Sequence, residues 1–159
     1  MKVSSRHHLR SDEVDDLVDT VRDHLGVELD ADAFELVEFS DEAFDAILVG
    51  GRPLAFRLED EPFLTVRGAN EFPPERGTVT VDAGAVQFVS GGADVMRPGI
   101  VEADERIEEG DPVVVVEETH GKALAIGTAL VDGGDMTGDS GRVVDSIHHV
   151  GDELYEFDV

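Results

Sequence analysis

A pair of consecutive prolines interrupts the middle of this 159-residue chain and limits the folds that are open to it. The run Pro73–Gly77 reads Pro-Pro-Glu-Arg-Gly, and such a segment continues neither a helix nor a central strand. The length allows one mid-sized domain or two small ones, and the break favours two. We therefore expect one domain at 1–75 and a second at 76–159.

The first half combines one helix with short strands. Apolar residues recur at helical spacing and predict an amphipathic helix over 11–25, with Ser11 as its N-cap and Gly26 at its end. Its core-facing stripe consists of Val14, Leu17, Val18, Val21 and Leu25. Strand-like segments follow at Ala33–Phe39, Ala46–Val49, Leu54–Leu58 and Phe63–Val66. These elements predict a small α+β unit.

The second half is expected to be mainly β. A strand at Thr78–Val81 leads to a short helix, Ala83–Val89, which Asp82 can cap and which ends at Gly91-Gly92. Further strand-like segments lie at Val113–Glu117, Ala123–Val131, Val143–Ile147 and Leu154–Phe157. Short strands at close spacing with frequent glycines favour a small barrel, so the whole chain is assigned to the α+β class.

The net charge of the chain indicates the salt concentration in which the protein works rather than the class of partner that it binds. Lys and Arg total 12 and Asp and Glu total 37, a formal net charge of −25, and Lys2 and Lys122 are the only lysines. This composition resembles that of cytoplasmic proteins of halophilic archaea. At molar salt the Debye length is about 3 Å, so repulsion between carboxylates, and between carboxylates and RNA, is screened. We expect a cytoplasmic protein with no membrane partner, because the chain also lacks an apolar run of membrane-spanning length.

Known catalytic and metal-binding patterns do not fit this sequence. The run Gly138–Gly141 resembles a protease nucleophile segment only superficially, and the spacing of Asp132, Asp135 and Asp139 is not that of an EF-hand loop. The run Gly121–Ala123 lacks the other residues of a phosphate-binding loop. With no cysteine and no metal-ligand spacing of histidines, we expect no catalytic residue, no metal and no cofactor.

A glycine-rich segment after the second helix is the best candidate for ligand contact. Gly91, Gly92 and Gly99 permit close backbone approach, and successive N–H groups there suggest an anion-binding concavity. Asp94 is suited to accept hydrogen bonds, and Arg97 to pair with phosphate or stack on a base. The alternative is that the glycines only form turns and that Met96 lies in the core. The candidate RNA-binding residues are Gly91, Gly92, Ala93, Asp94, Met96, Arg97, Pro98 and Gly99, with Lys122, His148 and His149 on later strands.

The run Val81–Ile100 resembles the opening of a PUA domain, an RNA-binding module found in pseudouridine synthases and archaeosine transglycosylases. A Gly-Ala in the helix, a second Gly-Ala after the turn and a later Pro-Gly carry the likeness, which extends over 77–157. The chain start Arg6–Leu9, the link Phe72-Pro73 and the ending Ile147–Tyr155 resemble archaeal proteins with a pre-PUA domain. These are similar to the eukaryotic family of malignant T-cell-amplified sequence proteins.

The resemblance implies a non-catalytic RNA-binding protein that acts in translation reinitiation or ribosome recycling. It implies contact with the small ribosomal subunit or a tRNA end, and a protein partner carrying a translation-initiator-type domain. A rival interpretation is an accessory subunit that supplies RNA specificity to a tRNA- or rRNA-modifying enzyme. A third is a β-barrel that binds a small molecule in a closed apolar pocket.

Overall fold

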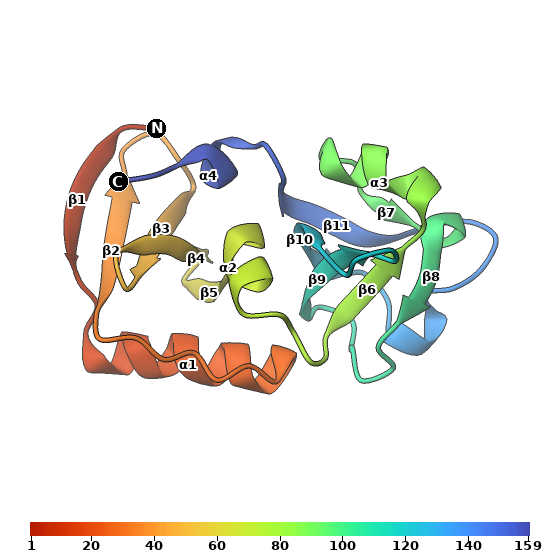
Figure 1. Cartoon of the computed structure of the whole chain (residues 1–159), viewed down its shortest axis with the longest axis horizontal. Helices are drawn as coiled ribbons and strands as arrows, with labels where there is room; N and C mark the ends of the chain where they lie inside the picture. The colour runs from red at the N-terminus through yellow and green to blue at the C-terminus, as the bar shows by residue number, and fades with distance from the viewer.

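The computed structural model describes all residues, 1–159, and pairs the strands into two separate sheets (Figure 1). The first sheet is antiparallel in the order β1-β2-β3-β4-β5. Its strands are β1 (Val3–His8), β2 (Phe34–Phe39), β3 (Phe44–Val49), β4 (Arg52–Leu58) and β5 (Glu61–Leu64). No strand belongs to both sheets.

Helix α1 (Ser11–Leu25) packs against this sheet through the expected apolar stripe, with Leu17, Val21 and Leu25 fully buried. It ends at Gly26, whose φ of 68° is the left-handed conformation that glycine adopts readily. The expectation that Ser11 caps the helix was wrong. The N-cap is Arg10, and its backbone N–H donates to the Glu13 carboxylate at 3.0 Å.

The second sheet has the order β7-β11-β10-β9-β6-β8 and forms a nearly closed barrel. Its strands are β6 (Thr78–Val81), β7 (Val95–Met96), β8 (Ile100–Ala103), β9 (Pro112–Glu117), β10 (Ala123–Ala129) and β11 (Arg142–His149). Strands β6 and β9 are parallel, whereas the other pairs are antiparallel. The 3₁₀ turn Arg97–Gly99 joins the two edge strands, β7 and β8. A cluster of 14 buried hydrophobic residues fills the interior.

Helix α2 (Val66–Glu71) lies between the two sheets (Figure 1). The core of the first half continues across it to Val114, Ala123 and Ile126 of the second sheet. The Asn70 side chain also bridges the halves, since its oxygen accepts the Ala123 N–H at 2.8 Å. The two sheets therefore share buried surface.

Two segments differ from their predicted structure. The expected strand at Leu154–Phe157 was wrong: Glu153–Glu156 forms a short helix, α4, because the Asp152 carboxylate caps it by accepting the Tyr155 N–H at 2.9 Å. The expected strand through Val66 ends at Leu64, since Thr65 caps α2 by accepting the Gly68 N–H. No helix of the structure is long and apolar enough to cross a membrane.

Candidate functional site

An open groove of about 430 Å³ lies beside α3 (Ala83–Ser90) on the second sheet. Helix α3 forms as expected, because the Asp82 carboxylate accepts the Ala85 N–H at 2.9 Å. The helix, the following glycine loop and the β7 turn enclose a mostly apolar groove. Its lining residues are Asp82, Gly84, Ala85, Phe88, Val89, Ala93, Asp94, Val95, Met96, Pro98 and Gly99.

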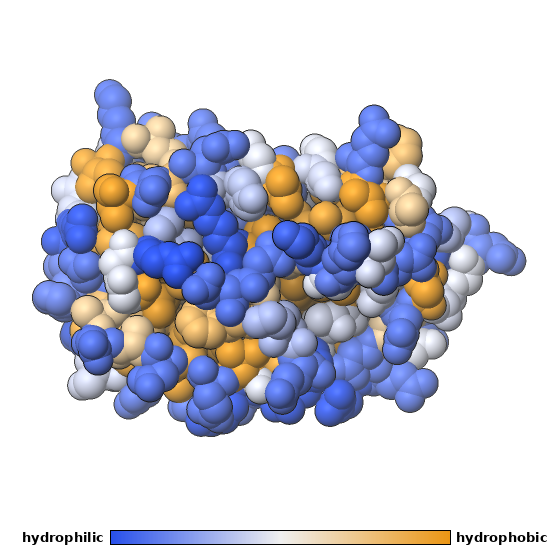
Figure 2. Space-filling view, in the orientation of Figure 1, coloured by the Kyte–Doolittle hydropathy of each residue, from blue (hydrophilic) through white to orange (hydrophobic).

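Two large apolar side chains in this groove are exposed to solvent. Phe88 is 67% exposed and Met96 is 49% exposed, so Met96 is not a core residue. Figure 2 shows apolar side chains at the α3 end of the surface, and others over the first half of the molecule, among hydrophilic side chains. Aromatic faces of this kind stack on unpaired bases, and each stacked base contributes about 1–3 kcal/mol. The sequence analysis did not single out Phe88. Its position could have been found from the sequence, because Ala85, Val86 and Val89 face inward and leave Phe88 on the outer face of α3.

The glycines shape the groove by close packing. Gly92 has a φ of 97°, and a Cβ there would lie 2.7 Å from the His149 Nε2 atom. A Cβ on Gly99 would lie 2.9 Å from the Ala85 Cβ. Larger residues at Gly92 and Gly99 would therefore push the loop and the turn away from their neighbours.

The anion-binding concavity expected from the successive N–H groups is contradicted by the structure. Gly91 donates to carbonyls at the end of α3, and Gly92 donates to the Val89 carbonyl at 3.1 Å. Ala93 donates to the Phe88 carbonyl at 3.0 Å. Because these N–H groups close the helix end, they are not free to bind phosphate.

Asp94 lines the groove but is engaged by β11. Its carboxylate accepts the Ser146 N–H at 2.8 Å and an Arg142 N–H at 2.9 Å. These two bonds hold the pKa of Asp94 below its usual range. Asp94 therefore fastens the loop as an ionised group, and the exposed Arg142 is a cation at this end of the groove that sequence reasoning missed.

Arg97, which the sequence suggested for pairing with phosphate or stacking on a base, is half-buried. Its Nε donates to the Asp135 carbonyl at 2.9 Å, and another guanidinium nitrogen donates to the Ser140 carbonyl at 3.0 Å. The guanidinium thus holds the 132–141 loop against the turn at Arg97–Gly99.

The three candidates from later in the chain do not line the groove, and one of them, Lys122, lies in a turn and not on a strand. His148 is 1% exposed and lies between the two halves of the molecule. His149 packs behind the glycine loop, with its Nδ1 3.0 Å from the Ser90 carbonyl. Lys122 is exposed in the β9–β10 turn. Burial removes His148 from any RNA-contacting surface.

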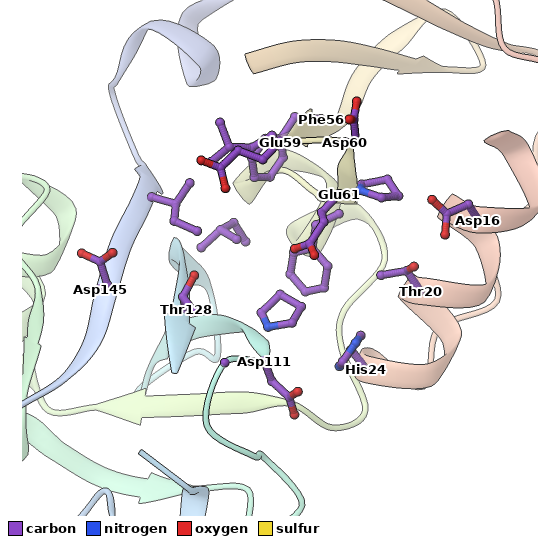
Figure 3. Close-up of a pocket in the computed structure, with 17 residues that line it drawn as sticks. Asp16, Thr20, His24, Phe56, Glu59, Asp60, Glu61, Asp111, Thr128 and Asp145 are labelled. Carbon is purple, nitrogen blue, oxygen red and sulfur yellow. The ribbon is translucent and has the colours of Figure 1, made fainter. Parts of the chain in front are cut away.

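A larger cleft, of about 600 Å³, lies between α1, the β4–β5 turn and the second sheet (Figure 3). Its acidic lining residues are Asp16, Glu59, Asp60, Glu61, Asp111 and Asp145. This lining holds no Lys or Arg to pair with phosphate, and its two phenylalanines, Phe56 and Phe63, are buried and offer no free face for stacking. The smaller groove beside α3 is thus the better candidate for RNA.

Comparison with known proteins shows which family the chain belongs to. The PUA domain family model matches residues 77–151. An uncharacterized protein of Methanocaldococcus jannaschii is 43% identical over 115 residues, covering 72% of this chain and 71% of that protein. Translation machinery-associated protein 20 of Saccharomyces cerevisiae is 33% identical over 132 residues, covering 79% of this chain and 72% of that protein. The chain belongs to this family of PUA-domain proteins.

Structural comparison extends the likeness to almost the whole chain. A crystal structure of a hypothetical protein from Pyrococcus horikoshii superposes with a TM-score of 0.84 and 34% identity, covering 96% of this chain and 98% of that one. Malignant T-cell-amplified sequence 1 of Danio rerio is 29% identical over 119 residues, covering 72% of this chain and 66% of that protein. These matches confirm the expected family and the α+β fold with a PUA-type barrel.

Proposed function

We propose that this PUA-domain protein binds RNA without catalysis and acts in translation, in the cytoplasm. The supporting observation is the groove beside α3, where Phe88 and Met96 are exposed. Its two carboxylates are both engaged: Asp82 caps α3, and Asp94 is held by Arg142 and Ser146. In a chain of net charge −25, this groove presents apolar surface with no unengaged carboxylate.

The groove suits an unpaired stretch of RNA. Stacking on Phe88 requires an unstacked base, which duplex RNA does not offer to a side chain. At the same end, the half-exposed guanidinium of Arg142, which pairs with Asp94, offers its remaining N–H groups to phosphate. The ligands that fit are a single-stranded tRNA end or an exposed loop of ribosomal RNA.

We further propose that the protein docks on the small ribosomal subunit during initiation or recycling, beside a partner that carries a translation-initiator-type domain. The names of its relatives, which associate them with the translation machinery, support this setting. The rival interpretation of a small-molecule barrel has no support in the fold, because buried side chains fill the barrel interior.

The test is to crosslink the protein to RNA in cells at native salt and sequence the bound RNA. The proposal expects small-subunit ribosomal RNA or tRNA ends. Recovery of the protein in a stable complex with an RNA-modifying enzyme, with reads centred on modified nucleotides, would instead support the accessory-subunit interpretation.

A further inference from the structure

The N-terminal strand is an exposed surface without carboxylates in a strongly acidic protein. Residues 1–11 contain no Asp or Glu, although the chain has 37. The runs 46–58 and 119–131 also lack them but fall mostly on buried strands, and the run 83–93 forms α3 and the loop beside the groove. By contrast, β1 is exposed at five of its six residues. Burial therefore does not explain the missing carboxylates, and the pattern points to an anionic partner.

The side chains of this segment add donors and positive charge. Lys2, His7 and His8 form no ion pair within the protein, whereas Arg6 pairs with Glu35 through two hydrogen bonds of 3.1 and 3.2 Å. Of the three Lys and Arg residues within residues 1–11, Arg6 and Arg10 pair with carboxylates, Arg10 with Asp12 at 3.1 Å, and Lys2 does not.

The backbone of β1 is also unpaired along its outer side. Strand β1 is the edge of the first sheet, with β2 as its only neighbour (Figure 1). Leu9 donates its N–H inward to the Phe34 carbonyl at 3.0 Å. Because inward and outward groups alternate along an antiparallel strand, the N–H and C=O groups of Arg6 and His8 point away from β2.

We propose that the β1 edge binds an extended acidic segment of a partner protein, which adds to the first sheet as a further strand. The free edge supplies main-chain hydrogen bonds, and the positive charges select acidic side chains. A peptide fits this edge better than RNA does. The edge alternates donors with carbonyl acceptors, which a second strand satisfies in turn, whereas a phosphate backbone offers acceptors only.

The first experiment titrates the folded protein with an end-blocked peptide of alternating glutamate and valine and follows its backbone amide signals by NMR. The proposal expects the largest shifts at Arg6 and His8, and no response to the corresponding lysine-valine peptide. Shifts confined to other segments, or β1 shifts caused only by oligouridylate, would overturn it. The latter result would make the edge a nucleic-acid surface.

Two matched pairs of variants separate the backbone from the charge. His8→Ala keeps the outward N–H and His8→Pro removes it, so only His8→Pro should weaken peptide binding by about tenfold, the value of roughly one hydrogen bond. Lys2→Glu should also weaken binding, whereas Arg22→Glu on α1 should not. Equal affinity of the His8→Ala and His8→Pro proteins, both shown to be folded by circular dichroism, would contradict strand addition.

Discussion

The backbone N–H of Val66 donates to Nε2 of His148 at 3.1 Å and so joins the first residue of α2 to β11, the last strand of the second sheet. The other ring nitrogen of His148 lies 2.9 Å from the Asp152 carboxylate. Asp152 in turn caps α4. A single buried imidazole thus links α2 to β11 and to the adjoining helix α4, although α2 lies about 80 residues earlier in the chain.

Replacing this histidine should destabilise the whole molecule. His148→Ala leaves the Val66 N–H without a partner in a buried site and opens a cavity, so we expect a loss of about 2–4 kcal/mol. His120→Ala, in an exposed turn, is the matched control and should change stability little. Chemical denaturation at molar salt measures both. A His148→Ala protein as stable as the control would remove the histidine from the account of the interface.

The same network predicts a loss of stability in acid. Burial alone would raise the pKa of Asp152, but hydrogen bonds from His148 and from the N–H groups of His149 and Tyr155 lower it below the usual value of 3.8. A depressed pKa in the folded state stabilises the protein above the unfolded pKa, and this contribution is lost as the pH falls through the folded value. Asp152→Asn should flatten the pH dependence of the melting temperature below about pH 4.

We propose that the domain boundary lies near residues 75 and 76. The linking segment is nevertheless held to the end of α1 by hydrogen bonds. The Arg76 guanidinium donates to the Arg22 carbonyl at 2.8 Å at the end of α1, and the backbone N–H of Glu75 donates to the Leu25 carbonyl. We expect Pro73–Gly77 to resist limited proteolysis at molar salt, and Arg76→Ala to make it more susceptible. Rapid cleavage of the unaltered protein in this segment would show that the fastening is ineffective.

We also propose that the protein is adapted to high salt. At low salt the excess of carboxylates repels over a Debye length of about 30 Å at 0.01 M, against about 3 Å at 1 M. The melting temperature should therefore rise steeply with salt concentration. A melting temperature that does not change between millimolar and molar salt would refute this adaptation.

Arg97 and Arg142 should give opposite results when each is changed to alanine. Arg97→Ala releases two loop carbonyls from a half-buried guanidinium and should cost about 1–2 kcal/mol of stability. Arg142→Ala should be nearly neutral for stability but should weaken RNA binding. The free energy of unfolding and the RNA affinity are measured for both variants. If only Arg97→Ala lost RNA binding, the roles assigned to the two arginines would be contradicted.

Sequence patterns predicted the elements that are determined by residues close to one another along the chain. The stripe of α1, its end at Gly26 and the Asp82 cap of α3 are of this kind. The exposed polar strand β1 has no apolar alternation, and its place in the sheet depends on β2, so it was not predicted. The α4 segment has strand-like composition, and the cap by Asp152 decides its conformation.

From the sequence, the candidate site was predicted only as the segment that follows α3, Gly91–Gly99, with three residues later in the chain. The partners of Arg97 and Asp94 lie in segments about forty to fifty residues away along the chain, so their engagement was invisible in the sequence. The buried position of His148 likewise depends on contact with α2. Tertiary contacts, which spacing does not encode, determine which polar side chains remain free.

The most direct test of RNA binding in the groove is a titration of single-stranded RNA with the bases unpaired, at molar salt. Phe88→Ala removes the exposed aromatic face on α3, and Val101→Ala removes an exposed apolar side chain on β8 as the control. Loss of one stacked base predicts an affinity about fivefold to over a hundredfold weaker for Phe88→Ala, with Val101→Ala unchanged. Equal affinities of the Phe88→Ala, Val101→Ala and unaltered proteins would contradict the groove as the RNA site.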